Sequence, residues 1–272
     1  MSPAPFLSVV VPAFNEVGSI RRTVEAIGAH LQSRGRTYEI IVAADGNDGT
    51  RELVADMARS DNRISVIGSA ERGGKGRGVR NGVFKATGQY IGFCDADYKT
   101  PVEEFEKLLP WLEQGDEVVI GSRRVDNAQV EVPQPLYRRL GSQAFGVVRN
   151  MLVGLGDIRD TQCGFKFFQR GAARAIFGRQ RVDGYMFDVE ILYLARLLGY
   201  RIREVGVRWQ DDGDSRLNLV AGNLKNAKDI LSIRFLKYTP QQRGADLGAA
   251  APAGAALALS SPAAASGKGR GA

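Results

Sequence analysis

The sequence predicts an α/β protein built on a doubly wound, mostly parallel sheet, with a helical region toward the C-terminus. Three observations support this prediction: short apolar runs, helical patterns that alternate with them, and polar residues directly after the runs. Continuous apolar runs are typical of strands buried on both faces, and regular strand–helix alternation gives a parallel sheet covered by helices. Ligands of such sheets bind at the carboxyl ends of the strands, so the polar residues there are candidates for a site.

The first strand–helix units precede residue 68. Phe6 to Val11 is an apolar run that stops at Pro12, which has no N–H for a sheet ladder, and a helical pattern follows from Ser19 to Ser33. Tyr38 to Ala44 is the second buried run, and the glycine-containing turn Asp45–Gly49 closes it. A helix at residues 50–59 and a short strand at residues 64–67 are expected next.

The following units extend to residue 124. Glycines at positions 73, 74 and 76 mark the start of a helix that we expect to end near Ala86. Tyr90 to Cys94 is a third buried run and ends on Asp95. Val102 to Glu113 has a helical pattern, and Val118 to Gly121 is again a short apolar run.

After residue 124 the alternation weakens. We expect helices at Leu136 to Leu155, Asp188 to Leu198 and Leu217 to Phe235, with an extended segment at Ile202 to Trp209. Asp188 and Glu190 fall on different helix faces, so one is expected to be structural and the other to orient a basic residue. Residues 1–238 form the expected domain, in halves 1–124 and 125–238. The Ala-, Gly-, Ser- and Pro-rich residues 239–272 are expected to be a disordered tail.

Composition narrows the function classes. The net charge of +7 suits nucleic acid, anionic lipid or a phosphorylated substrate. The two cysteines lie in different contexts and have no metal-ligand spacing, so a secreted disulfide framework is not expected and a reducing cytoplasm is the default. We find no N-terminal signal pattern and no apolar run of about 18 residues, so any membrane contact is expected at the surface. The single histidine, His30, falls in an expected surface helix, which disfavours chemistry that needs a histidine base.

Two carboxylates separated by one residue, Asp95 and Asp97, follow the Tyr90–Cys94 run. An isolated pair of this kind more often caps the next helix, but its position at a strand end in a doubly wound sheet favours a functional role. Carboxylate oxygens are ligands for Mg²⁺ and Mn²⁺, and such an ion neutralises a diphosphate leaving group. We therefore expect Mg²⁺ or Mn²⁺ at Asp95 and Asp97.

Two other stretches have two interpretations each. Asp45 either accepts hydrogen bonds from a base edge or a ribose hydroxyl, or belongs to a turn, whereas Asp48 is assigned to the turn and the helix start. The basic, glycine-rich residues 72–78 lack the Gly-Lys-Ser/Thr of a Walker A loop. Lys75 and Arg77, at a helix start, either hold an anion or belong to a solvated basic loop.

Together these motifs resemble family-2 glycosyltransferases, over roughly residues 7–236. The first half of the resemblance rests on SVVVPAFNE at residues 8–16, Asp45-Gly46, Gly74-Lys75-Gly76, Asp95-Ala96-Asp97 and Gly121-Ser122-Arg123. DTQCGFK at residues 160–166, FDVE at residues 187–190, and Glu204-Val205 with Trp209 are similar to the dolichyl-phosphate β-glucosyltransferase branch. The resemblance implies a GT-A-like fold, with a nucleotide-sugar-binding half at residues 1–124 and an acceptor half at residues 125–238.

The resemblance also implies roles for individual residues. The nucleoside-diphosphate pocket would be formed by Pro12, Phe14, Glu16, Asp45 and Lys75. Asp95 would contact the donor while Asp97 holds the metal ion. The acceptor phosphate would lie at Arg123, Arg138 and Ser142. Arg216 would supply a cation near the diphosphate, so the catalytic set is Asp95, Asp97, Arg123 and Arg216. Cys163 and Trp209 are expected to be buried.

The activity implied is an inverting transfer of a hexose, glucose first, from UDP-glucose or another nucleotide sugar to a polyprenyl or dolichyl phosphate. A phosphate monoester, with its second pKa of about 6, needs no base to attack. Two alternatives stay open: a GDP-mannose-dependent polyprenyl-phosphate mannosyltransferase, and a family-2 enzyme with a soluble, non-lipid acceptor. A nucleic-acid-binding module is disfavoured because the basic residues 72–80 lack aromatics. We expect a cytoplasmic protein bound peripherally to the membrane through basic helices, and make no prediction of oligomeric state.

Overall fold

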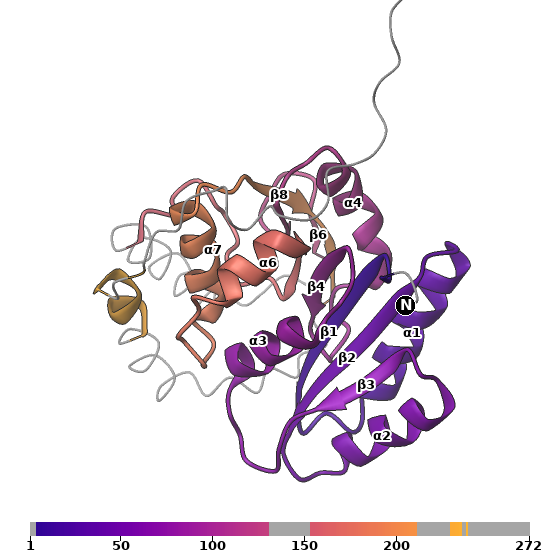
Figure 1. Cartoon of the computed structure of the whole chain (residues 1–272). Helices are drawn as coiled ribbons and strands as arrows, with labels where there is room; N and C mark the ends of the chain where they lie inside the picture. Colours follow the sequence, from indigo (N-terminus) through magenta and orange to yellow (C-terminus); the bar gives the residue numbers. More distant parts are fainter. Residues whose placement is uncertain (1–3, 131–152, 211–228, 236–237, 239–272) are drawn as a thin grey trace, which may run out of the picture.

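The computed structural model describes residues 4–130, 153–210, 229–235 and 238, which form a sheet covered by helices on both faces (Figure 1). The seven strands follow the order β3-β2-β1-β4-β7-β5-β8. Every neighbouring pair is parallel except those made by β7, which is antiparallel to both β4 and β5. The expected α/β class with a mostly parallel sheet is therefore confirmed.

The strands of the first half lie where the apolar runs predict them. They are β1 (Leu7–Phe14), β2 (Tyr38–Asp45), β3 (Ile64–Ile67), β4 (Tyr90–Cys94) and β5 (Val118–Ser122). The second half adds β7 (Phe165–Gln169) and β8 (Ile202–Gly206), and a separate two-stranded sheet pairs β6 (Gln129–Val130) with β9 (Arg208–Trp209). Phe14 and Asp45 are partners in the β1–β2 register, so the carboxyl ends of these strands lie together.

Helices cover the two faces in two groups. One face carries α1 (Ile20–Ser33), α2 (Thr50–Ser60), and α4 (Phe105–Glu113) after a 3-10 turn at Val102–Glu104. The other carries α3 (Lys75–Lys85), α6 (Arg170–Phe177) and α7 (Phe187–Leu197). Alternate strand residues serve the two cores: Val9 packs under the first group and Val10 under the second.

The structure shows three elements that the sequence pattern did not predict: β6, β7 and α6. β7 reads FKFFQ, and its lysine interrupts the apolar run that marks a strand buried on both faces. Phe167 belongs to one core and Phe168 to the other, while Lys166 is fully buried. The strand exists because a partner elsewhere in the chain compensates the charge of the lysine.

Several expectations fall on residues outside the described ranges. They are most of the helix at residues 136–155, most of the helix at residues 217–235, and the tail at residues 239–272. Residues 229–235 are helical, in agreement with the end of the second helix. The two expected halves share one sheet, and the boundary at residue 124 stays a prediction. Within the ranges described, no helix is long and apolar enough to cross a membrane.

Close packing between β4 and β7 gives a stability prediction. A Cβ added at Gly92 would lie 2.1 Å from Cδ1 of the buried Phe167. Gly92→Ala should therefore lower the free energy of unfolding by about 1–3 kcal/mol, measured by urea denaturation. Gly18→Ala is the control, because nothing lies within 4 Å of its added Cβ. Equal stability of the two variants would contradict this packing.

Candidate functional site

Asp95 and Asp97 lie at the carboxyl edge of the sheet, directly after β4, and each contacts a lysine. Lys75 Nζ is 2.6 Å from Asp95 Oδ1, and Lys99 Nζ is 3.5 Å from Asp97 Oδ2. The two carboxylate side chains keep exposed fractions of 38% and 34%. Both acids are therefore open to a ligand while a cation already faces each of them.

The charges at this edge compete with one another. Burial raises the pKa of Asp97, and the neighbouring charge of Asp95 raises it further. Burial alone would lower the pKa of Lys75, but Asp95 and Asp188 outweigh burial, so this pKa lies above its usual value. A carboxylate whose ionisation is disfavoured by burial and by a neighbouring carboxylate is stabilised in its charged form when a divalent cation binds.

The donor set fits Mg²⁺ or Mn²⁺ shared with a ligand. Both ions prefer oxygen ligands, which Asp95 and Asp97 supply. Among the described residues, no group of three or more His, Cys, Asp or Glu side chains is placed to hold a metal ion. Other oxygens, such as those of a diphosphate and water, would therefore complete the coordination, as is usual for Mg²⁺ at phosphate sites.

The loop that precedes β7, residues 160–164, packs against Asp95. A Cβ added at Gly164 would fall 2.1 Å from Asp95 Oδ2 and 2.4 Å from Oδ1. Only a glycine lets the loop approach the carboxylate this closely. The DTQCGFK stretch singled out by the sequence is thus part of the same site as Asp95.

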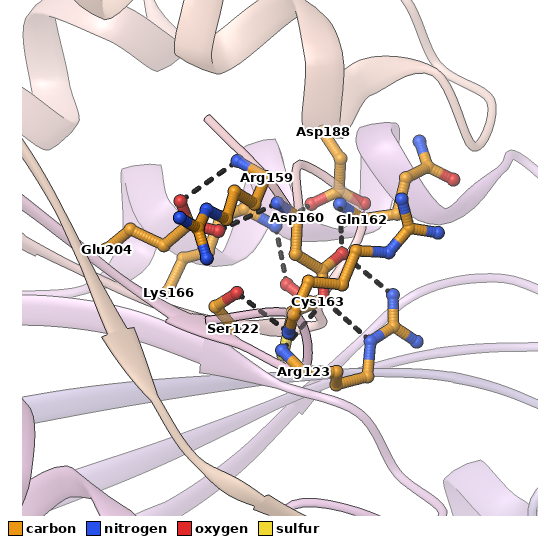
Figure 2. Close-up of polar contacts among 10 residues, drawn as sticks. Ser122, Arg123, Arg159, Asp160, Gln162, Cys163, Lys166, Asp188 and Glu204 are labelled. Carbon is orange, nitrogen blue, oxygen red and sulfur yellow. Dashed lines mark hydrogen bonds and ion pairs between the residues drawn. The ribbon is translucent and has the colours of Figure 1, made fainter. Parts of the chain in front are cut away.

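Arg123 is held by the first residue of that loop (Figure 2). Its Nε and one terminal nitrogen donate to the two oxygens of Asp160, at 2.7 and 2.9 Å. Burial alone would lower the pKa of Arg123, but Asp160 outweighs burial and raises it. Arg123 in turn holds the pKa of the buried Asp160 below its usual value, although burial acts in the opposite direction. Arg123 is therefore a fixed positive charge with part of its side chain, 22%, still exposed.

Glu204 of β8 fixes the backbone on which Asp160 sits (Figure 2). Its two carboxylate oxygens accept the backbone N–H groups of Arg159 and Asp160, at 2.9 and 2.7 Å. The indole of Trp209 lies under Arg123, with the guanidinium carbon 5.4 Å from the ring centroid. The sequence motifs contain Glu204 and Asp160 but do not predict these contacts, because Arg123, the partner of Asp160, lies in a different motif 37 positions earlier in the chain.

A second ion pair lies on the other side of the loop. Lys166 Nζ donates to Asp188 Oδ1 at 2.6 Å and to the carbonyl of Cys163 (Figure 2). Burial raises the pKa of Asp188, and Lys166 and Lys75 offset part of that rise. Glu190 instead accepts the backbone N–H groups of residues 181 and 182 and the hydroxyl of Tyr238. The expectation that one of these acids is structural and the other faces a basic residue is confirmed.

The residues expected to contact the nucleoside surround the ends of β1 and β2. Pro12, within β1, pairs with Ala43 of β2 in the register. Phe14 is 36% exposed, and the guanidinium carbon of Arg72 lies 4.4 Å from its ring centroid. Glu16 follows in the next turn and accepts the hydroxyl of Ser19 at 2.8 Å. Phe14 and Asp45 are the last residues of β1 and β2, and Glu16 follows two positions after β1, so these side chains start from the same edge of the sheet.

Asp45 ties the neighbouring loop to the end of β2. Its oxygens accept the backbone N–H groups of Ser69 and Gly73, at 3.2 and 2.7 Å. The turn interpretation of Asp48 is confirmed, because Oδ1 accepts the N–H and hydroxyl of Thr50 at the start of α2. A role for Asp45 at a base edge stays a prediction.

Three expected site residues, Arg138, Ser142 and Arg216, lie outside the described residues. Cys163 and Trp209 are buried, as the sequence predicts, with 1% and 8% of their surface exposed. His30 differs from the expected surface position: its ring is 8% exposed, because it hydrogen-bonds to Glu106 of α4.

Comparisons with known proteins identify the family of the chain. The model of the family described as glycosyl transferase family 2 matches residues 8–177. The dolichyl-phosphate beta-glucosyltransferase ALG5C of Trichomonas vaginalis is 34% identical over 240 residues, covering 84% of this chain and 70% of that protein. The dolichyl-phosphate beta-glucosyltransferase of Homo sapiens is 34% identical over 252 residues, covering 87% of this chain and 77% of that protein.

Solved structures share the fold. The crystal structure of glucosyl-3-phosphoglycerate synthase from Mycobacterium tuberculosis has a TM-score of 0.64 at 20% identity, covering 85% of this chain and 80% of that one. A complex of the same synthase with Mn²⁺, uridine-diphosphate and phosphoglyceric acid has a TM-score of 0.62 at 19% identity, covering 84% of this chain and 77% of that one. The GT-A-like fold implied by the sequence is thereby confirmed.

The Arg123–Asp160 pair gives a second stability prediction. Asp160→Asn should lower the free energy of unfolding at pH 7 by about 3 kcal/mol, at the low end for a buried pair since Arg123 keeps some solvent contact. The folded-state pKa of Asp160 is lowered, so its stabilisation is present above its unfolded pKa of about 3.9 and lost as the pH falls through the folded pKa.

The difference in free energy of unfolding between wild type and Asp160→Asn should therefore stay constant from about pH 8 to pH 5 and become smaller below about pH 4. Urea denaturation at each pH measures it. Asp126→Asn is the matched control, because Asp126 pairs with Arg159 while 97% of its side chain is exposed. A difference that grows toward acid pH would contradict the ion pair.

Proposed function

The chain belongs to glycosyl transferase family 2, and from this premise we propose that it transfers glucose, with inversion, from UDP-glucose to the phosphate of a dolichyl or other polyprenyl lipid. The observation that supports this best is the loop at residues 160–164. It touches the carboxylate of Asp95 through Gly164 and holds the guanidinium of Arg123 through Asp160. The loop at residues 160–164 therefore lies between Asp95, at the proposed donor site, and the guanidinium of Arg123.

On the donor side, the surface formed by Pro12, Phe14, Glu16 and Asp45 would take the nucleoside, and Lys75 would face the diphosphate. The names of the relatives support glucose, since they are dolichyl-phosphate beta-glucosyltransferases. Uridine is supported by a structural neighbour whose crystals contain uridine-diphosphate.

Asp95 and Asp97 would hold Mg²⁺ or Mn²⁺, in agreement with the Mn²⁺ in that neighbour. The ion, when bound, supplies positive charge to the departing diphosphate. Lys75 adds a second positive charge at the same edge, since its pKa is raised and it stays protonated at neutral pH.

On the acceptor side, Arg123 would bind the lipid phosphate, together with Arg138 and Ser142, and Arg216 would approach the diphosphate. A phosphate monoester is mostly dianionic at neutral pH and attacks without a general base. Its charge repels the diphosphate, and a preorganised guanidinium offsets that repulsion. Attack on the side of the sugar opposite the leaving group inverts the anomeric carbon.

A phosphorylated soluble acceptor is the second candidate, because a fixed guanidinium binds a phosphate whether or not it carries a lipid. The fold neighbour crystallised with phosphoglyceric acid is consistent with this reading. A GDP-mannose-dependent lipid transfer is the third. We place the lipid-transfer activity at the cytoplasmic membrane surface, with the protein bound peripherally.

A transfer assay tests the proposal. It combines a short polyprenyl phosphate or phosphoglyceric acid with labelled UDP-glucose or GDP-mannose, with and without Mn²⁺. We expect glucose on the lipid phosphate only in the presence of the metal. Asp97→Ala should reduce the rate by about 100-fold or more, equivalent to about 3 kcal/mol of transition-state stabilisation.

Transfer only to phosphoglyceric acid would show that the acceptor is a soluble molecule, and transfer of mannose would show that the donor is GDP-mannose. Transfer that persists in a metal chelator, at the same rate in Asp97→Ala, would contradict the assigned metal site.

A further inference from the structure

Four charged side chains of alternating sign lie between the interior of the sheet and its carboxyl edge: Lys166, Asp188, Lys75 and Asp95. Lys166 pairs with Asp188, and Lys75 pairs with Asp95. The two pairs lie near one another, because the ammonium of Lys75 lies over the ring of Phe187, the residue directly before Asp188, and Asp188 is one of the charges that raise the pKa of Lys75. Lys75 thus lies between two carboxylates, one at the edge and one in the interior.

The carboxylates of Asp95 and Asp188 differ in solvent exposure and in how firmly they are held. Asp95 is 38% exposed and is one of the two acids expected to turn toward a cation. Asp188 is buried at the start of α7, and the fully buried Lys166 holds it at 2.6 Å (Figure 2). The carbonyl of Cys163 fixes the ammonium of Lys166 in turn. The side chain of Asp188 is therefore held in place by Lys166, independently of what Asp95 binds.

The backbone of Lys75 is anchored beside α7. A Cβ at Gly74 would lie 2.2 Å from the carbonyl oxygen of Asp183, and one at Gly76 would lie 2.6 Å from Cβ of Phe187. The backbone N–H of Gly76 donates to the same Asp183 carbonyl at 2.9 Å. The ammonium of Lys75 lies 6.0 Å from the centroid of the Phe187 ring, next to Asp188 in the chain. The start of α3 is thus docked where Lys75 is near both acids.

We propose that Asp188 is a positioning residue that holds Lys75 at the diphosphate site when Asp95 turns to the metal ion. The inference rests on the proposed function, since it assigns Lys75 and Asp188 to the donor site of that reaction. With Asp188 present, Lys75 still has a carboxylate nearby when Asp95 turns to the metal ion. Without Asp188, Lys75 has Asp95 as its remaining partner among these four groups and competes with the metal ion for it.

The variant must remove the charge of Asp188 without leaving Lys166 uncompensated. Asp188→Asn alone would bury an ammonium without its counter-charge, which strongly destabilises a protein and endangers the fold. The double variant Lys166→Met/Asp188→Asn removes both buried charges, an exchange that is often tolerated. Glu190→Gln is the matched control, because it alters a buried carboxylate on the same helix that bonds to backbone N–H groups and Tyr238.

The experiment measures UDP and GDP binding by calorimetry over a range of Mn²⁺ concentrations, with thermal unfolding recorded for each protein. In the double variant we expect the Mn²⁺ concentration for half-maximal nucleotide binding to rise by about 10- to 100-fold. Glu190→Gln should leave this concentration unchanged while its unfolding temperature falls. An unchanged Mn²⁺ requirement in the double variant would overturn the inference.

A Lys75→Met background separates positioning from a general structural effect. If Asp188 acts through Lys75, the Lys166→Met/Asp188→Asn change should add no further rise in the Mn²⁺ requirement once Lys75 is gone. The same rise in both backgrounds would overturn the inference. Wild-type protein that binds neither nucleotide at any Mn²⁺ concentration would instead overturn the proposed function, and this inference with it.

Discussion

A lysine in the middle of a sheet that is buried on both faces must have a counter-charge, and the position of that counter-charge constrains the rest of the site. Lys166 is fully buried, and its ammonium is satisfied by Asp188 and by the carbonyl of Cys163. Burying two ions costs as much as their attraction returns, so such a pair contributes little net stability compared with apolar residues. What it does is fix β7, the preceding loop and α7 relative to one another.

Because β7 and α7 are fixed, the loop at residues 160–164 contacts a charged side chain on each side. Asp160 holds Arg123 on one side, and Gly164 lies against Asp95 on the other. Glu204 holds the loop by its backbone. A transfer between two phosphate-bearing substrates needs cations whose positions are set before the substrates arrive, since reorganisation would otherwise raise the barrier. The ion pairs of the described residues supply this preorganisation.

At the edge of the sheet that carries Asp95 and Asp97, negative charge is only partly compensated. Burial and the neighbouring charge of Asp95 raise the pKa of Asp97, and a lysine ammonium lies beside each of the two carboxylates. A group that is held charged but incompletely compensated gains most from a divalent cation. Binding of a metal ion and a nucleotide at this edge, as proposed, would complete a charge balance that the described residues leave open. The lysines, which already stand at the two acids, would then be released toward the phosphates.

The sequence by itself determined the first five strands, the helices between them and the family, because these depend on local periodicity and on contiguous motifs. It also placed Asp95 and Asp97 correctly at a strand end. Only the tertiary structure decided that FKFFQ is an antiparallel strand at the centre of the sheet, that Asp188 neutralises its lysine, and that Gly164 touches Asp95. Each of these depends on a partner elsewhere in the chain, such as Asp188, which is 22 positions from Lys166. A local pattern reports whether a residue is apolar or charged, but whether a charge can be buried is decided by the group that folding brings opposite it.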